Sequence, residues 1–208
     1  MHVVLLGDST LDNRAYTGSE PDVTTHLRQL LPKSTGVTLG AIDGSTTSDL
    51  ESQLKEVPST ATHLVVSIGG NDALLNSDLL NLPVTSTAQA LSIFRHRIGQ
   101  FEVSYCRAIE SVLSLNRSTA ICTIYNGNLD PPEADAARVA LMMFNDAILR
   151  CGFERNLPII DFRFVCSEKT DYANPIEPSG SGGRKIAKAI AGWLGVGEPR
   201  KFSQVRTR

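Results

Sequence analysis

The stretch Val3-Val4-Leu5-Leu6-Gly7-Asp8-Ser9-Thr10 decides the fold of this chain. Its four apolar residues form a continuous run that is short enough to predict a buried strand. The glycine and the small polar residues that follow predict a tight turn directly after that strand. Further along the chain, short apolar runs of this kind recur, with longer stretches between them.

Short β-rich runs alternate with stretches of helical periodicity. Five strands are expected, at residues 3–6, 37–42, 63–68, 120–125 and 158–162. Five helices are expected, at residues 23–31, 47–57, 88–115, 133–155 and 183–194. Strands that alternate with helices imply βαβ units and a parallel sheet with helices on both faces. Because such crossovers are right-handed, we expect a three-layer α/β fold with a five-stranded parallel sheet of flavodoxin-like order.

The composition is that of a globular protein without a charge bias. The chain has 208 residues, of which 41% are hydrophobic, and its formal net charge is −2. One domain is expected over residues 1–197. Residues 198–208 are polar and basic and are expected to form a flexible tail, because they offer few apolar groups for docking. A charge this close to neutral argues against nucleic-acid binding, which requires a basic bias.

No segment predicts export, a membrane span or a metal site. No apolar run approaches the roughly 20 residues that cross a bilayer, and the apolar start of the chain leads into Gly7 rather than a cleavage site. Cysteines stand at positions 106, 122, 151 and 166, without a CxxC pair and without a histidine at metal-ligand spacing. Reduced thiols in a cytoplasmic protein are therefore expected, with no metal and no cofactor. The oligomeric state is left open.

Small polar residues gather where the expected strands end. Ligands of a doubly wound sheet bind outside the carboxyl ends of its strands, so these segments form the candidate site. Glycine and small polar residues permit tight turns there and leave backbone N–H groups free. The segments are Gly7-Asp8-Ser9-Thr10, Asp43-Gly44-Ser45-Thr46, Gly69-Gly70-Asn71-Asp72 and Tyr125-Asn126-Gly127-Asn128, followed by the loop at residues 163–182.

Together these segments resemble the SGNH, or GDSL, hydrolase family over nearly the whole chain. Gly7-Asp8-Ser9-Thr10 matches the first family block, whose serine is the nucleophile, and Gly44 matches the glycine of the second block. Gly69-Gly70-Asn71-Asp72 matches the block whose asparagine helps to hold the oxyanion. The resemblance implies that Ser9 attacks a carbonyl while the Ser9 N–H, the Gly44 N–H and the Asn71 amide bind the oxyanion. Such preorganised donors can each contribute about a few kcal/mol.

The last family block departs from this pattern. The family places an aspartate and a histidine three residues apart before the final helix, and Asn174 and Glu177 stand at these positions here. None of the four histidines lies beyond position 96. Since a serine hydroxyl needs a neighbouring base, we expect Glu177 to replace the histidine, with Asn174 orienting Glu177 or the substrate. Burial would raise the pKa of the carboxyl and suit it to this task. Asp12 is a second candidate base.

Three functions are considered. The first is a serine esterase or acyl hydrolase that acts on a small ester or acylated small molecule through an acyl-Ser9 intermediate. The alternative, suggested by the missing histidine, is a non-catalytic protein that binds a small ligand on the same scaffold. A nucleotide or flavin binder is disfavoured, because no GxGxxG follows the first strand. The absence of a long lid insertion favours a small or exposed ester over a bulk lipid.

Asp8 is expected to fix its turn, and Asn13 and Tyr16 are candidates for lining the pocket.

Overall fold

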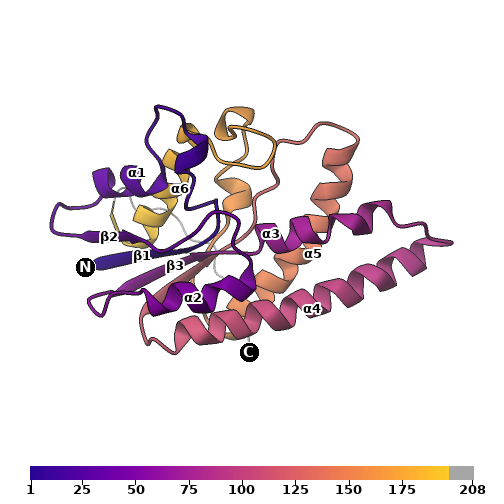
Figure 1. Cartoon of the computed structure of the whole chain (residues 1–208), viewed down its shortest axis with the longest axis horizontal. Coiled ribbons are helices and arrows are strands. Elements are labelled where there is room, and N and C mark those ends of the chain that lie inside the picture. Colours follow the sequence, from indigo (N-terminus) through magenta and orange to yellow (C-terminus); the bar gives the residue numbers. More distant parts are fainter. Residues whose placement is uncertain (197–208) are drawn as a thin grey trace.

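Five parallel strands form one sheet in the order β2-β1-β3-β4-β5 (Figure 1). The strands are β1 His2–Gly7, β2 Gly36–Leu39, β3 His63–Ser67, β4 Ser118–Cys122 and β5 Ile159–Ile160. This computed structural model describes residues 1–196, so the segment at residues 198–208 lies outside the described part. The strand order is that of a flavodoxin-like sheet, and the predicted fold class is confirmed.

Six α-helices follow or connect the strands within residues 1–196. They are α1 Val23–Leu30, α2 Leu50–Lys55, α3 Gly70–Leu75, α4 Thr87–Leu113, α5 Glu133–Glu154 and α6 Gly180–Trp193. The sequence did not predict α3, which is too short to show a helical period. Helix α6 begins earlier than expected, because the hydroxyl of Ser179 accepts a hydrogen bond from Gly182 N at 3.2 Å and caps the helix.

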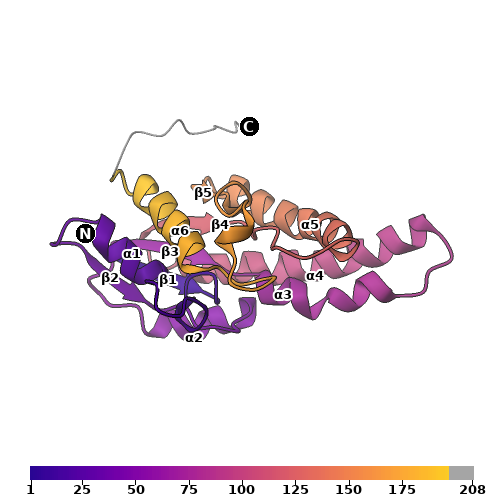
Figure 2. The ribbon, with the colours of Figure 1, turned by 90° about the horizontal axis from the view of Figure 1, so that it is seen from above.

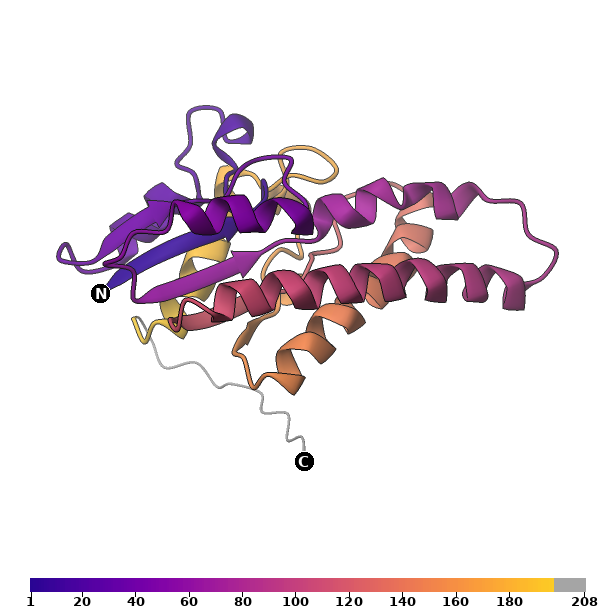
Figure 3. The ribbon, with the colours of Figure 1, turned by 60° about the horizontal axis from the view of Figure 1, so that its bottom comes forward.

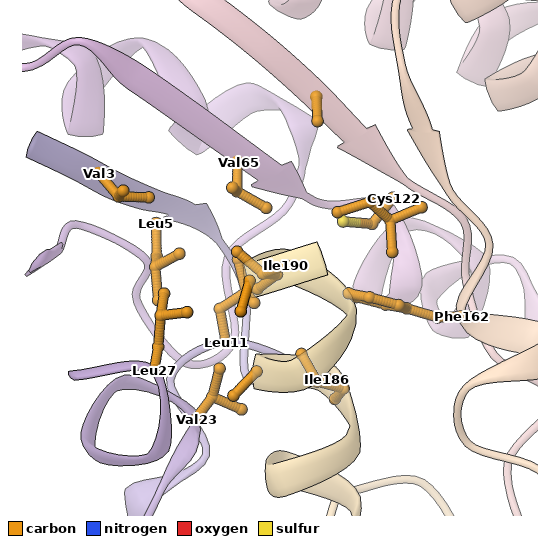
Figure 4. Packing of buried hydrophobic residues seen from close by; sticks show 14 of the residues in the cluster. Val3, Leu5, Leu11, Val23, Leu27, Val65, Cys122, Phe162, Ile186 and Ile190 are labelled. Atoms are coloured by element: carbon orange, nitrogen blue, oxygen red, sulfur yellow. The ribbon is translucent and has the colours of Figure 1, made fainter. Parts of the chain in front are cut away.

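Both faces of the sheet are covered by helices. Val3 and Leu5 of β1 point to the face that carries α1 and α6, whereas Val4 and Leu6 point to the face that carries α2, α4 and α5. Figure 2 shows α1 and α6 side by side over the sheet. In Figure 4 the apolar side chains of these two helices meet those of the strands, for example Leu27 against Leu5. The continuous apolar run of β1 is therefore explained by burial on two faces.

The end of β1 is held tightly against β3. Gly7 has a φ of 134°, and a Cβ atom at this position would lie 1.7 Å from the carbonyl oxygen of Ser67. Only glycine fits this close approach, which places the residues after β1 next to those after β3. Because all strands are parallel, the loops that follow them share one edge of the sheet.

Helix α4 reaches well beyond the sheet. It has 27 residues, and Figure 3 shows its first half extending past the strands with α3 alongside it. No helix within residues 1–196 combines the length and the apolar character that a membrane crossing requires. All four cysteines are free, and three of them are buried.

Candidate active site

Ser9 lies in a tight turn at the carboxyl end of β1. The carbonyl of Asp8 accepts hydrogen bonds from Leu11 N and Asp12 N, each at 3.1 Å. The carboxylate of Asp8 accepts a further bond from Thr10 N at 3.0 Å, so the prediction that Asp8 fixes the turn is confirmed. Burial raises the pKa of Asp8 to about 6.

The residues that match the family's oxyanion donors have N–H groups without a hydrogen-bond acceptor in the described part of the chain. The backbone N–H groups of Ser9 and Gly44 donate to no acceptor within residues 1–196. Asn71, the second residue of α3, donates from Nδ2 to the carbonyl of Ser45 at 2.9 Å. This bond ties α3 to the loop that carries Gly44, and it leaves the second hydrogen of Nδ2 available.

Glu177 lies at the end of a short turn before α6. The backbone of this turn closes on itself, because Ala173 N donates to the carbonyl of Glu177 at 2.9 Å. Oδ1 of Asn174 accepts hydrogen bonds from Ile176 N and Glu177 N, each at 2.9 Å. Asn174 is exposed and bonds to the backbone of the turn, so it shapes the segment that holds Glu177 rather than contacting its carboxylate.

The environment of Glu177 changes its acidity. The residue is only 8% exposed, and burial raises the pKa of its carboxyl to about 7. The Ser9 hydroxyl lies close enough to Glu177 to offset part of this rise in pKa, although the two side chains do not meet hydrogen-bond geometry. Oε2 of Glu177 has no hydrogen-bond partner within residues 1–196. The charges of Asp43 and Asp8 raise the pKa further. A carboxyl that titrates near neutral pH suits general-base work.

Buried side chains hold the turn that carries Glu177 in place. Asn13 is fully buried; its Nδ2 donates to the carbonyl of Pro178 at 3.2 Å and its Oδ1 accepts from Val23 N at 2.9 Å. The hydroxyl of Tyr125 donates to the carbonyl of Ile176 at 2.6 Å. The segments that follow β1 and β4 therefore both hold the turn that carries Glu177.

An apolar cavity of about 340 Å³ opens beside Ser9. Ser9, Asn71 and Glu177 line it, whereas Gly44, Asn174 and the alternative base Asp12 do not. Asn13 and Tyr16 also stay outside, so the prediction that they line the pocket is wrong. Much of the wall comes from apolar side chains of α3, the segment after it, α4 and α5, among them Leu74, Leu80, Phe94, Leu141 and Phe144.

The site offers little to a metal ion. Within residues 1–196, no three His, Cys, Asp or Glu side chains are grouped as metal ligands. The groups that could do chemistry here are the Ser9 hydroxyl, the carboxyl of Glu177 and a set of N–H donors. Such groups can in principle support nucleophilic attack on a carbonyl with stabilisation of the oxyanion.

Solved structures share this fold. The chain resembles a lipase from Streptomyces rimosus with a TM-score of 0.66 and 14% identity, over 91% of this chain and 98% of that one. An acetyl xylan esterase matches with a TM-score of 0.69 and 14% identity, over 94% and 100% of the two chains. A phospholipase A1 from Streptomyces albidoflavus NA297 matches with a TM-score of 0.69 and 16% identity, over 91% and 97%.

These structural similarities are too distant in sequence to assign a family, whereas a family model does assign one. No curated protein matches the sequence. The model of the GDSL-like lipase/acylhydrolase family matches residues 5–184, which include Ser9, Gly44, Asn71 and Glu177. The chain therefore belongs to the GDSL-like lipase/acylhydrolase family.

Proposed function

We propose that this protein hydrolyses esters through an acyl intermediate on Ser9, with Glu177 as the base. The observation that carries the proposal is that Ser9, Asn71 and Glu177 line one cavity while the family's oxyanion donors keep N–H groups unpaired among the described residues. The N–H groups of Ser9 and Gly44 are unpaired within residues 1–196, and Asn71 keeps one amide hydrogen free. A buried hydroxyl with a carboxyl nearby and unpaired N–H donors in the adjoining segments is suited to acyl transfer.

The steps follow from these positions. Glu177 takes the proton of the Ser9 hydroxyl while Oγ bonds to the ester carbon, and the negative carbonyl oxygen is held by the N–H donors. The bond between carbon and the alcohol oxygen then breaks, and the alcohol leaves with the proton from Glu177. Water then attacks the acyl carbon while Glu177 accepts one of its protons. The bond from that carbon to Oγ of Ser9 breaks as Oγ takes the proton back from Glu177, and the carboxylic acid is released.

The acyl part of the substrate is expected to be apolar. The cavity beside Ser9 has a volume of about 340 Å³ and an apolar wall. Pockets for small molecules begin at about 300 Å³, so the space suits an acyl chain longer than acetyl. Residues 1–196 contain no long lid insertion, but α3 and α4 extend beyond the sheet and supply apolar side chains to the cavity wall.

Covalent labelling tests the proposal directly. A fluorophosphonate probe is expected to label the wild-type protein and not Ser9→Ala, and p-nitrophenyl butyrate is expected to be hydrolysed by the wild type only. Absence of both labelling and turnover would favour the alternative of a non-catalytic binding protein, for which Glu177 in the histidine position is the motive. Labelling that survives in Ser9→Ala would show that another residue is the nucleophile.

A further inference from the structure

Gly44 and Asn71 come from strands on opposite sides of β1. Gly44 follows β2, and Asn71 lies in α3, which follows β3; both strands are hydrogen-bonded to β1 rather than to each other. Beyond the strand ends, the sheet therefore does not connect the two segments directly. Gly44 itself makes no hydrogen bond to another backbone group within residues 1–196, so its position depends on its neighbours in the chain.

Asp72 of α3 bonds to the segment after Gly44 with both oxygens of its carboxylate. Oδ2 accepts a hydrogen bond from Thr47 N at 3.0 Å, and Oδ1 accepts one from the Thr47 hydroxyl at 2.7 Å. Thr47 is buried and Asp72 is half-buried, so water competes weakly for these bonds. Two bonds to two groups of one residue fix the orientation of this segment as well as its distance from α3.

Asn71, the residue before Asp72, makes another bond between α3 and this segment. Its Nδ2 donates one hydrogen to the carbonyl of Ser45 at 2.9 Å, and the second hydrogen is the one available to an oxyanion. Without Asp72, the link would depend more on the same amide that has to face the oxyanion. Asp72 bonds to the segment without using that amide, and it does not line the cavity beside Ser9.

We propose that Asp72 is a positioning residue of the oxyanion site: its two bonds to Thr47 keep the Gly44 N–H and the Asn71 amide at a fixed separation. This inference rests on the proposed function. Donors stabilise an oxyanion when they are already placed where its charge develops, so a small shift of Gly44 relative to Asn71 slows the reaction. The alternative is a role in folding alone, because Thr47 also begins the 3₁₀ helix Thr47–Asp49 that leads into α2.

This role needs the hydrogen bonds of Asp72 rather than its charge. Burial raises the pKa of the Asp72 carboxyl, so the structure does not favour the charged form. In Asp72→Asn the amide oxygen can accept from Thr47 N while the amide nitrogen donates to the Thr47 hydroxyl, whereas Asp72→Ala loses both bonds. Thr47→Val removes one of the two bonds from the other side with little change of shape.

A pair of esters that differ in one atom measures the oxyanion site. p-Nitrophenyl butyrate forms an oxyanion, whereas its thiono analogue, with C=S in place of C=O, forms a larger sulfur anion that accepts hydrogen bonds weakly. The ratio of kcat/KM for the oxygen ester to kcat/KM for the thiono ester therefore reports how well the donors fit the oxyanion. Because the ratio is measured within one protein, a lower folded fraction cancels.

Variants of the pair then separate positioning from folding. We expect Asp72→Ala to lower the ratio about tenfold and to lower kcat for p-nitrophenyl butyrate, with KM changed by less than about twofold, because the donors act in the transition state. Thr47→Val is expected to lower the ratio about threefold, and Asp72→Asn to keep it within about twofold of the wild type. Asp146→Ala, which removes an exposed aspartate of α5, is the control and is expected to keep the ratio.

The outcomes that contradict the inference are distinct. A ratio unchanged in Asp72→Ala, or lowered as strongly in Asp72→Asn as in Asp72→Ala, would overturn it. If Asp72→Ala does not fold, an unchanged ratio in Thr47→Val overturns it in the same way. If the wild type hydrolyses neither ester, the proposed function itself fails and the inference falls with it.

Discussion

The side-chain amide of Gln53 is bonded to both backbone groups of Gly7. Its Oε1 accepts a hydrogen bond from Gly7 N at 2.8 Å, and its Nε2 donates to the carbonyl of Gly7 at 2.8 Å and to the Ser45 hydroxyl at 3.1 Å. Gln53 is buried, so these bonds are shielded from water. One residue of α2 thus holds the turn that carries Ser9 beside the loop that carries Gly44.

Replacing Gln53 by leucine should therefore cost both stability and activity. The substitution removes the buried partner of Gly7 N and one of the partners of the Gly7 carbonyl, which also accepts from Ile42 N, and we expect the free energy of unfolding to fall by about 2–4 kcal/mol. Urea denaturation measures this loss. Gln100→Leu, at an exposed position on α4, is expected to change stability by less than about 0.5 kcal/mol. Equal effects of the two substitutions would show that the contact with Gly7 is not important.

The base assignment predicts the pH dependence of the reaction. A general base must be ionised, so kcat/KM for p-nitrophenyl butyrate is expected to rise with pH and to level off above about 7, the pKa of Glu177. Glu177→Gln is expected to lower kcat/KM by about 10²–10⁴-fold and to abolish this inflection. Asp8→Asn tests whether the other buried carboxyl causes the inflection instead, because the pKa of Asp8 is raised only to about 6. An inflection that disappears in Asp8→Asn but remains in Glu177→Gln would contradict the assignment.

The same carboxyl should make the protein less stable at higher pH. The pKa of Glu177 is about 7 in the folded chain and 4.5 when the group is free, so the folded state binds more protons between these values. Stability from this group is therefore present below about pH 4.5 and is lost as the pH rises toward 7. Glu177→Gln is expected to have little effect at pH 4.5 and to be more stable than the wild type by about 3 kcal/mol at pH 8, at roughly 1.4 kcal/mol per unit of pKa change. Denaturation curves at both pH values would contradict this if the difference were the same.

The sequence predicted the sheet and the parts of the site that follow its strands. The apolar runs at β1, β3 and β4 are buried on two faces, which makes their pattern easy to recognise. Ser9 and Asn71 were found because they stand directly after such runs. Both line one cavity with Glu177, as expected for segments at the same edge of a parallel sheet.

Buried polar residues and the cavity were beyond the reach of sequence patterns. Asn13 and Gln53 have the same residue types as many surface positions, and only the folded backbone around them makes them buried partners of distant carbonyls. Helix α3 has six residues, less than two turns, so it carries no period. The wall of the cavity depends on how α3, α4 and α5 pack beyond the sheet, which no local pattern records.

Filling the cavity should change which acyl chains are accepted. Ala140 of α5 lines the cavity, and its neighbour Val139 is 59% exposed. In Ala140→Phe we expect kcat/KM for p-nitrophenyl octanoate to fall about tenfold or more relative to p-nitrophenyl acetate, because the longer chain loses its space. Val139→Phe is expected to leave the ratio as it is in the wild type. A ratio unchanged in Ala140→Phe would place the acyl chain elsewhere.

The turn before α6 should also accept the residues that the family carries there. An aspartate at position 174 keeps an oxygen for the bonds from Ile176 N and Glu177 N, so the turn can persist in Asn174→Asp. Combined with Glu177→His, this change places an imidazole, with a free pKa of about 6.5, where the carboxyl now lies beside Ser9. We expect Asn174→Asp/Glu177→His to hydrolyse p-nitrophenyl butyrate at least as fast as the wild type, whereas Asn174→Asp/Glu177→Ala loses about 10²-fold or more. Since both variants remove the carboxyl, only a base at position 177 explains a difference between them, and equal loss in both would mean that the proton of Ser9 leaves by another route.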